Sequence, residues 1–488
     1  MHHRNQIAGL VFLLSGVIPA HGGEWTKEPG VRVSGGNVPF VYQLEGGGYR
    51  LYFCGQGGIL SAKSADGLNF TAEPGVRTPG CDPSLVKLDD GRYRMYYKLA
   101  SGPGGPGQSV HRSYSAISND GLNFVSEGLR LESAGTIDNG WVSVPEVVRT
   151  FDGRWRMYYV SARDSIANVI ASAVSEDGLH FVREEGVRVQ GMVDPAVVAL
   201  PNGQYWLFGM VGLGAQGAQV IRSATSADGL RFVMDSDVVA RAGGPDDRNG
   251  LFDPSVVGLP DGRYRVYYGG DSGKTLSATG SRTANPGVGS GVAVSAADPR
   301  RSVLAPGSIA SLYGEQMTTQ TAGTNVEVNG LQAAVFYASA TQINFAIPEG
   351  VAGTAAHIVV TAPEGRQTAG LAPVREVSPA LFTLANSGAG EAAALDAVDF
   401  SPGPFHVASG ARYVSLFGTG IRRARRVTVT LGGLPVEVLY AGPQQQHEGL
   451  DQINIRIPPG YPLRGPLALE VGADGEPAGA GVTLTVVD

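Results

Sequence analysis

One stretch decides the fold of this sequence: Cys81-Asp82-Pro83-Ser84-Leu85-Val86-Lys87-Leu88-Asp89-Asp90-Gly91-Arg92-Tyr93-Arg94-Met95-Tyr96-Tyr97. Its first half supplies the apolar residues of a short strand. Its second half alternates in steps of two, which is the period of a strand and not of a helix. Asp90-Gly91 lies between the halves and is typical of a tight turn. The stretch therefore predicts a β-hairpin.

The hairpin recurs at intervals of about 50 to 60 residues, and a period of that size is typical of repeat architectures. Each copy has a strand that begins beside a proline, a turn that contains glycine, and a second strand rich in aromatic residues. The four further copies begin at Asn37-Val38-Pro39, Val144-Pro145-Glu146, Asp194-Pro195 and Asp253-Pro254.

A second hairpin follows each of the first four copies. The motif Ser-x-Asp-Gly-Leu-x-Phe occurs at residues 64–70, 118–124, 175–181 and 226–232. We interpret it as structural, because Asp-Gly forms a turn between a third and a fourth strand while Leu and Phe pack between sheets. Four-stranded sheets in tandem are typical of a β-propeller.

The fifth copy lacks this second hairpin, and a matching strand occurs at the N-terminal end. Residues 25–32 closely resemble residues 70–77, which form the outer strand after copy one. We expect the N-terminal strand to complete the last blade, since such closure leaves no exposed sheet edge. The sequence thus predicts a five-bladed β-propeller over residues 23–283.

Length and charge bound the remaining possibilities. The 488 residues are too many for one ordinary domain, so two or three are expected. The net charge of −7 is mild, and no basic stripe indicates a nucleic-acid partner. No segment after the N-terminal one is apolar enough to cross a membrane.

The N-terminus predicts a targeting segment. A polar start precedes the apolar run from Ile7 to Ala20, and Ala20-His21-Gly22 offers small residues at a cleavage site. We expect a signal peptide over residues 1–22 and a secreted or cell-surface protein. An uncleaved anchor is disfavoured, because the run is shorter than the ~20 residues that span a bilayer. In an oxidising compartment, Cys54 and Cys81 form either a disulfide or two free thiols.

The C-terminal part contains a second duplication. Residues 284–296 are rich in small residues and predict a linker. Gln342-Ile343-Asn344 then corresponds to Gln452-Ile453-Asn454. Each half, of about 90 residues, has the strand pattern of an immunoglobulin-like β-sandwich, predicted over 297–388 and 389–488.

The duplicated halves resemble the Solibacter-type C-terminal domain family, which implies secretion and an accessory role. We interpret the amides of Gln-Ile-Asn as groups that satisfy a loop backbone, with a binding site as the alternative.

In a propeller the first strand of every blade lines the central axis, so its first residues gather at one mouth. Here those residues are Asn37, Asp82, Glu146, Asp194 and Asp253. Four carboxylates at one funnel repel one another and raise at least one pKa, which favours a proton donor near neutral pH. Asp-Pro can also merely start a strand, whereas strand chemistry does not require Glu146 at its place.

The five blades, the Asp-Pro strand starts and the glutamate in blade three resemble the five-bladed propeller glycoside hydrolases of families 43, 32 and 130 and their relatives. The resemblance covers about residues 23–283 and implies action on arabinans, xylans, fructans or mannosides. Carried over by position, it implies that Asp82 orients substrate or tunes a pKa and that Glu146 is the general acid. Blade one differs from the pattern of these families, because Asn37 occupies the position where a base or nucleophile is expected.

Three interpretations of this departure stay open. Asp194 or Asp253 supplies the base, a single acid suffices, or catalysis is lost and the funnel only binds glycan. The candidate catalytic residues are thus Glu146, Asp82, Asp194 and Asp253.

Other residues are expected around the same mouth. A sugar could stack on Trp141, and His111 could bind water or transfer a proton. The candidate substrate-binding residues are Asn37, Trp141, His111, Arg112 and Arg163. No cofactor is required, although Asp82, Asp194 and Asp253 could hold Ca²⁺ through waters on the axis. No His/Cys cluster indicates zinc.

We therefore expect an all-β protein, a five-bladed β-propeller followed by two immunoglobulin-like β-sandwich modules. We expect it to be a secreted glycoside hydrolase-like protein that acts on a poly- or oligosaccharide in the central funnel, and the sequence leaves open whether it is an active glycosidase. The alternatives are a non-catalytic glycan-binding protein and a surface protein whose propeller is only a scaffold. The sequence leaves open the sugar, the linkage, the stereochemical outcome and the oligomeric state.

Overall fold

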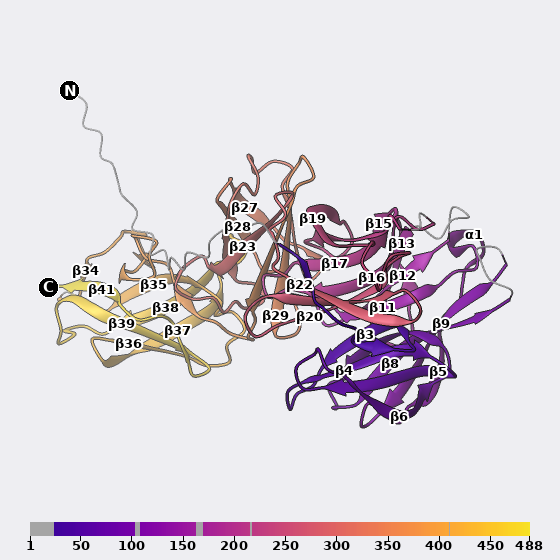
Figure 1. Ribbon diagram of the computed structural model, residues 1–488. Helices are drawn as coiled ribbons and strands as arrows, with labels where there is room; N and C mark the ends of the chain where they lie inside the picture. The colour runs from indigo at the N-terminus through magenta and orange to yellow at the C-terminus, as the bar shows by residue number, and fades with distance from the viewer. Residues whose placement is uncertain (1–23, 103–107, 163–168, 215–216, 409) are drawn as a thin grey trace.

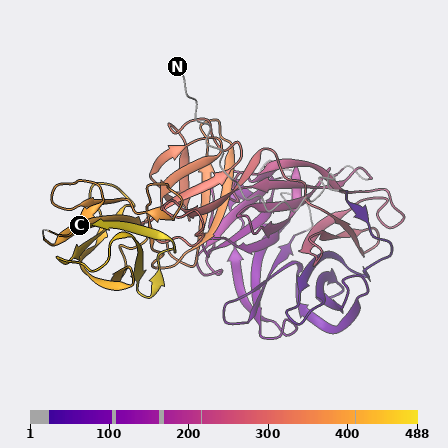
Figure 2. The same ribbon diagram turned by 90° about the vertical axis from the view of Figure 1, so that its left-hand side faces the viewer.

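The computed structural model describes residues 24–102, 108–162, 169–214, 217–408 and 410–488. Figure 1 shows a propeller at one end of an elongated molecule and two further β-domains at the other, and Figure 2 shows the same order from the side. In these residues one short helix occurs, α1 (Gly135–Asp138), and all other regular elements are strands. The predicted all-β architecture of five blades and two sandwiches is confirmed.

Each blade is an antiparallel sheet whose first strand contacts the first strands of its neighbours around the axis. Blade one contains β3 (Asn37–Gln43), β4 (Tyr49–Gly55), β5 (Gly58–Ser64) and β6 (Thr71–Thr78). Blade two contains β7 (Cys81–Lys87), β8 (Tyr93–Ser101), β9 (Val110–Ser118) and β10 (Val125–Leu131). Blade three contains β11 (Ser143–Arg149), β12 (Trp155–Ser161), β13 (Val169–Ser175), β14 (Val182–Arg183) and β15 (Val189–Gln190). Blade four contains β16 (Met192–Ala199), β17 (Tyr205–Val211), β18 (Val220–Ser226) and β19 (Val233–Arg241).

Blade five is closed by the N-terminal end of the described chain, as expected. It contains β20 (Phe252–Gly258), β21 (Tyr264–Gly270) and β22 (Lys274–Gly280), joined by β1 (Thr26–Lys27) and β2 (Val33–Ser34). Both N-terminal strands pair with β22, Thr26 lying opposite Thr279 and Val33 opposite Thr275. The outer strand comes from one end of the repeat region and the rest of the blade from the other, so the ring has no free sheet edge at its seam.

A repeated network links the blades at the outer rim. In blade one, Arg50 Nε pairs with Glu73 Oε2 at 2.9 Å, and Arg50 also donates to the carbonyl of Asp120 in blade two. Tyr52 donates its hydroxyl proton to the carbonyl of Gly121 at 2.7 Å. Gly121 has φ +72°, and a Cβ there would lie 2.8 Å from Arg50, so only glycine fits. The Asp-Gly turn thus also receives the preceding blade.

The same contacts recur around most of the ring. The equivalent arginine–glutamate pairs are Arg94–Glu127, Arg156–Glu184 and Arg265–Glu28. The equivalent tyrosine–glycine bonds are Tyr96–Gly178, Tyr158–Gly229 and Tyr267–Gly67. Blade four is the exception, where Trp206 takes the arginine position and donates Nε1–H to Asp235 at 2.8 Å. Trp25 packs 6.2 Å from Trp206 at this seam.

The first sandwich is an eight-stranded sheet that curves around its own core. Its strands are β23 (Val288–Ser295), β24 (Ile309–Gly314), β25 (Asn325–Val328), β26 (Leu331–Gln332), β27 (Val335–Ala338), β28 (Gln342–Ala346), β29 (Ala355–Thr361) and β30 (Gln367–Pro373). The linker predicted over 284–296 is therefore mostly strand β23. Its glycines allow close approach, because a Cβ on Gly289 would lie 2.6 Å from Thr368.

The second sandwich has its own core of buried aliphatic residues. Its strands are β31 (Ala380–Leu381), β32 (Gly390–Glu391), β33 (Ala394–Asp396), β34 (Phe405–His406), β35 (Arg412–Thr419), β36 (Val427–Leu431), β37 (Leu434–Pro443), β38 (Asp451–Ile457), β39 (Gly465–Ala473), β40 (Glu476–Pro477) and β41 (Val482–Val487). β31 falls before the predicted boundary at 389 yet pairs with β35 of this sheet.

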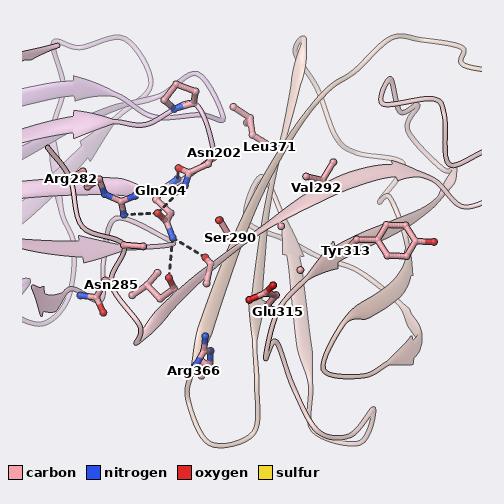
Figure 3. A pocket seen from close by; sticks show the side chains of 16 residues that line it. Asn202, Gln204, Arg282, Asn285, Ser290, Val292, Tyr313, Glu315, Arg366 and Leu371 are labelled. Atoms are coloured by element: carbon pink, nitrogen blue, oxygen red, sulfur yellow. Dashed lines mark hydrogen bonds between the residues drawn. The ribbon is translucent and has the colours of Figure 1, made fainter. Parts of the chain in front are cut away.

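Blade four and the first sandwich are in direct contact. Gln204 donates to the carbonyls of Val288 and Gly289 at 3.1 and 2.9 Å, and its Oε1 accepts from Arg282 (Figure 3). A cavity of about 610 Å³ lies beside these bonds. In the described part of the chain, no helix is long and apolar enough to span a membrane.

Candidate functional site

A bulge shapes the start of all five first strands at the axis. The residue before the strand proline has a positive φ, and the register to the second strand shifts there. Such a bulge re-aims the side chain of its extra residue. We call these five residues the pre-proline ring: Val38, Asp82, Val144, Asp194 and Asp253, with φ from 47° to 58°.

The strand register shows that Asn37, expected to be the counterpart of Asp82 in blade one, is not its counterpart. Asn37 lies opposite Cys54, as Cys81 lies opposite Lys98, so Asn37 corresponds to Cys81 and Val38 to Asp82. The side chain of Asn37 is exposed at the start of β3. The extra residue of the bulge explains the misplacement, because counting from the proline by one residue changes which side chain reaches the axis.

A second ring lies two residues further along the first strands, and Glu146 belongs to it. We call Phe40, Ser84, Glu146, Ala196 and Ser255 the inner ring, since register places them at equivalent positions.

Three members of the inner ring accept a backbone N–H from the next blade. Ser84 accepts from Val147 at 3.0 Å, Ser255 from Val41 at 2.9 Å, and Glu146 from Val197 at 3.2 Å. Glu146 therefore occupies a place where serine braces the blades elsewhere in the ring.

The environment of Glu146 favours its neutral form. Burial raises the pKa of Glu146 to about 8, against the opposing effects of the bonds from Val197 and Ser84. No charged partner contributes to that shift, although the side chain keeps some accessible surface. At neutral pH Glu146 holds a proton and can both accept and donate.

The pre-proline carboxylates gather around a lysine. Lys98 lies in β8, and its Nζ contacts Asp82 Oδ2 at 2.7 Å. Asp82 also accepts the N–H of Val144 at 3.1 Å, and Asp194 accepts that of Asp253 at 3.3 Å. Each bond joins one blade to the next, so Asp82 and Asp194 have a bracing role as well as a charge.

These groups influence one another's protonation. Burial alone would lower the pKa of Lys98, but the charge and hydrogen bond of Asp82, with the charges of Asp253 and Asp194, raise it. Burial raises the pKa of Asp194, with a further contribution from Asp82. Burial raises the pKa of Asp253 well above its ordinary value, followed by the charges of Asp194 and Asp82. No bond from another described residue reaches the Asp253 carboxyl, so it can donate to a ligand.

His111 and Trp141 lie together beside this cluster. Their rings stack with centroids 4.3 Å apart. The backbone N–H of His111 donates to the carbonyl of Gly140 at 2.8 Å. Burial, then the charge of Lys98, lowers the pKa of His111 to about 4, so the imidazole is neutral at pH 7. Nδ1 of His111 and Nε1 of Trp141 are buried without a partner among the described residues.

Asp138, which the sequence did not single out, holds the loop that carries Trp141. It is fully buried and pairs with Arg183, while its Oδ1 accepts the hydroxyl proton of Tyr159 at 3.0 Å. Its own carbonyl accepts the N–H of Trp141 at 2.9 Å. A buried aspartate of this kind carries no sequence signal, because its partner Arg183 is distant in the chain.

Two further expected residues do not join the cluster. Arg112 pairs with the exposed Glu132 at the rim of blade two. Arg163 lies outside the described residues.

Cys54 and Cys81 form a disulfide, which settles the alternative left open by the sequence. It joins the end of β4 to the start of β7, and the N–H of Asp82 lies 3.2 Å from Cys54 Sγ. The described residues contain one group of three potential ligand atoms within 4.8 Å of one another, in Cys54, Cys81 and Asp82. Its sulfurs are already bonded to each other, so this group does not fit a metal.

No family model and no curated protein matches this chain. Among solved structures, it is similar to an N-acetylgalactosamine deacetylase from F. plautii in complex with blood group B trisaccharide, at 16% identity and TM-score 0.43, over 52% of this chain and 95% of that one. An α-L-arabinofuranosidase from Lactobacillus brevis shows 13% identity and TM-score 0.42, over 52% and 92%. An endo-arabinase from Bacteroides thetaiotaomicron shows 14% and 0.41, over 53% and 99%. Similarity this weak does not indicate what the chain does.

Proposed function

We propose that the protein hydrolyses a glycosidic bond at the propeller axis, with the carboxyl group of Asp253 as the proton donor. The observation that supports this most is the contrast within the pre-proline ring. Asp253 is raised in pKa and receives no bond from another described residue, while Asp82 is ion-paired with Lys98. Two carboxyl groups whose surroundings keep one protonated and the other ionised are typical of acid–base pairs.

The step follows from these two states. The Asp253 carboxyl gives its proton to the glycosidic oxygen as the bond from that oxygen to the anomeric carbon breaks. A water molecule attacks the anomeric carbon, and the Asp82 carboxylate takes the proton that this water loses. His111 and Trp141 remain predictions as sugar-binding residues, because their unpartnered ring nitrogens are buried.

Glu146 remains a prediction as the donor. Its raised pKa suits the role, but its bond from Val197 gives it the bracing function of Ser84 and Ser255. A calcium ion held through waters also remains a prediction, and it would compete with the ammonium of Lys98. The Cys54–Cys81 disulfide supports export to an oxidising compartment, in line with the proposed signal peptide.

A second candidate function is glycan binding without cleavage. It is favoured by Val38 and Val144, which leave two of the five positions of the pre-proline ring without a polar side chain.

The test is sugar release from arabinan, xylan, fructan and mannan by the wild type and by Asp253→Asn. Hydrolysis predicts release that falls by about 10²- to 10⁴-fold in the variant. Asp261→Asn is the control, because Asp261 lies in an exposed turn and pairs only with Arg263. Glycan binding without release by the wild type would favour the second candidate.

A further inference from the structure

The duplicated Gln-Ile-Asn motif does not contact a loop backbone, contrary to our interpretation of the sequence. In the first sandwich, Asn344 Oδ1 accepts from Ser311 Oγ and from Gln342 Nε2, both at 2.9 Å. In the second, Asn454 Oδ1 accepts from Ser415 Oγ at 2.9 Å and from Gln452 Nε2 at 2.7 Å. The two amides of each motif instead bond to each other along one strand and to a serine on the neighbouring strand, which makes a polar row.

This row lies on the outer face of each sheet. Ile343 and Phe345 of β28 point into the core, so Gln342 and Asn344 point away from it. The same alternation in β38 places Ile453 and Ile455 in the core of the second sandwich. The remaining donor of each asparagine and the remaining acceptor of each glutamine have no partner in the described part of the chain.

Large aromatic and apolar side chains flank the amides at matching registers. Tyr337 lies opposite Asn344 and Tyr440 opposite Asn454, each just after a bulged residue, Phe336 or Leu439. These four side chains are between 38% and 49% exposed. On the other side of the amides, Tyr313 lies opposite Gln342 and Phe417 opposite Gln452. We call each set a tyrosine–amide strip.

The strip of the first sandwich continues toward the propeller. Val292 lies opposite Tyr313 and is 66% exposed, and both residues line the cavity between the sandwich and blade four (Figure 3). Across β27, β28 and β24, Tyr337 and Tyr313 lie two strand spacings and two residues of register apart, about 12 Å. An extended ligand can therefore contact both rings and the amides between them.

We propose that the two tyrosine–amide strips bind a neutral polysaccharide chain. Aromatic rings pack against the apolar faces of sugars, and a free amide donor beside a free amide acceptor matches neighbouring hydroxyl groups. The strip side chains carry no charge, which disfavours an ionic ligand. The choice of a glycan as the occupant rests partly on the proposed function, but the binding itself does not require cleavage. Two strips on one chain would strengthen retention through multivalency.

The test is affinity electrophoresis of the full chain through gels that contain arabinan, xylan, galactomannan or β-glucan. We expect at least one polysaccharide to retard the wild type, and Tyr337→Ala with Tyr440→Ala to weaken retention about five- to tenfold or more. Tyr337→Phe should retain binding, because the ring remains. Leu384→Ala is the matched control, an exposed apolar residue of the second sandwich outside the strip.

Asp253→Asn separates this proposal from the proposed function. It should lose sugar release and keep full retention on the gel. Three results would overturn the strip proposal: unchanged retention in the double tyrosine variant, no retardation of the wild type by any of the four polysaccharides, or a dimer in sedimentation that the tyrosine substitutions dissociate.

Discussion

At the outer rim of the propeller, four of five blades carry the same arginine–glutamate pair and the same tyrosine–glycine bond. At the axis, the pre-proline ring repeats its backbone in all five blades but holds three aspartates and two valines. The rim contacts repeat because each of these blades uses its arginine and tyrosine to bind the Asp-Gly turn of the next blade. The axis keeps the bulge and varies the side chain, and only Asp82 and Asp194 of the ring accept a backbone N–H from the next blade among the described residues.

Removing one of the arginine–glutamate pairs at the rim should reduce the stability of the protein more than any other change that we propose. Arg156→Ala removes one partner of a buried pair and leaves Glu184 without its cation, so we expect about 3–5 kcal/mol less unfolding free energy. Chemical denaturation measures this. Arg263→Ala is the control, since its exposed pair with Asp261 should contribute less than about 1 kcal/mol.

Asp253→Asn supplies the counterpart at the axis. It should leave the unfolding free energy nearly unchanged, because the raised pKa of Asp253 keeps its carboxyl neutral and asparagine is a neutral side chain of similar shape. A loss as large as that of Arg156→Ala would mean that the axis is as structural as the rim.

The Cys54–Cys81 disulfide lies next to Asp82 at the axis, but we expect it to stabilise the fold as the rim contacts do. Cys54→Ser with Cys81→Ser opens a loop closed over a separation of 27 residues, and we expect a loss of about 3–4 kcal/mol. Thermal melting of the double variant against the wild type measures it. No change in melting temperature would show that packing of blade one on blade two suffices without the bond.

Val38 tests whether the axial backbone is strained where the side chain is not functional. A β-branched residue at φ 55° is unfavourable, while asparagine tolerates this region. We expect Val38→Asn to raise the unfolding free energy by about 1 kcal/mol. Val125→Asn, on an exposed outer strand, should be neutral or destabilising. Equal losses in both variants would exclude strain at Val38.

Glu146 should make stability depend on pH. Its pKa is about 8 in the folded protein and 4.5 ordinarily, so the folded state binds more protons between these values. Stability from this group is full below pH 4.5 and falls as the pH rises toward 8, by on the order of 1 kcal/mol per pH unit. Glu146→Gln should flatten that decline and Glu437→Gln, an exposed control, should not. Identical slopes in both would exclude the raised pKa.

Much of the fold could be predicted because it repeats. The match between residues 25–32 and 70–77 predicted the closure of blade five, and the Asp-Gly turns predicted the hairpins. The axis was harder, because a bulge adds one residue without any sequence signal and moved the expected position from Val38 to Asn37. Contacts between distant segments, such as Lys98 with Asp82 and Arg183 with Asp138, depend on how blades are placed around the ring.

The seam between the domains was missed for a related reason. Small residues over 284–296 predicted a linker, yet Gly289 and Gly291 are small because β23 packs closely against its neighbours. The sequence predicted that the Gln-Ile-Asn amides bond to a nearby loop backbone. Their partners Ser311 and Ser415 instead lie on adjacent strands that are distant in the sequence.

The most direct test of the axial proton donor compares sugar release by Asp253→Asn and Glu146→Gln on whichever polysaccharide the wild type degrades. With Asp253 as donor, Asp253→Asn should lose about 10²- to 10⁴-fold in kcat/KM. Glu146→Gln, which keeps an acceptor for Val197, should stay within about tenfold of the wild type. Full activity in Asp253→Asn together with loss in Glu146→Gln would contradict this assignment and return the role to the inner ring.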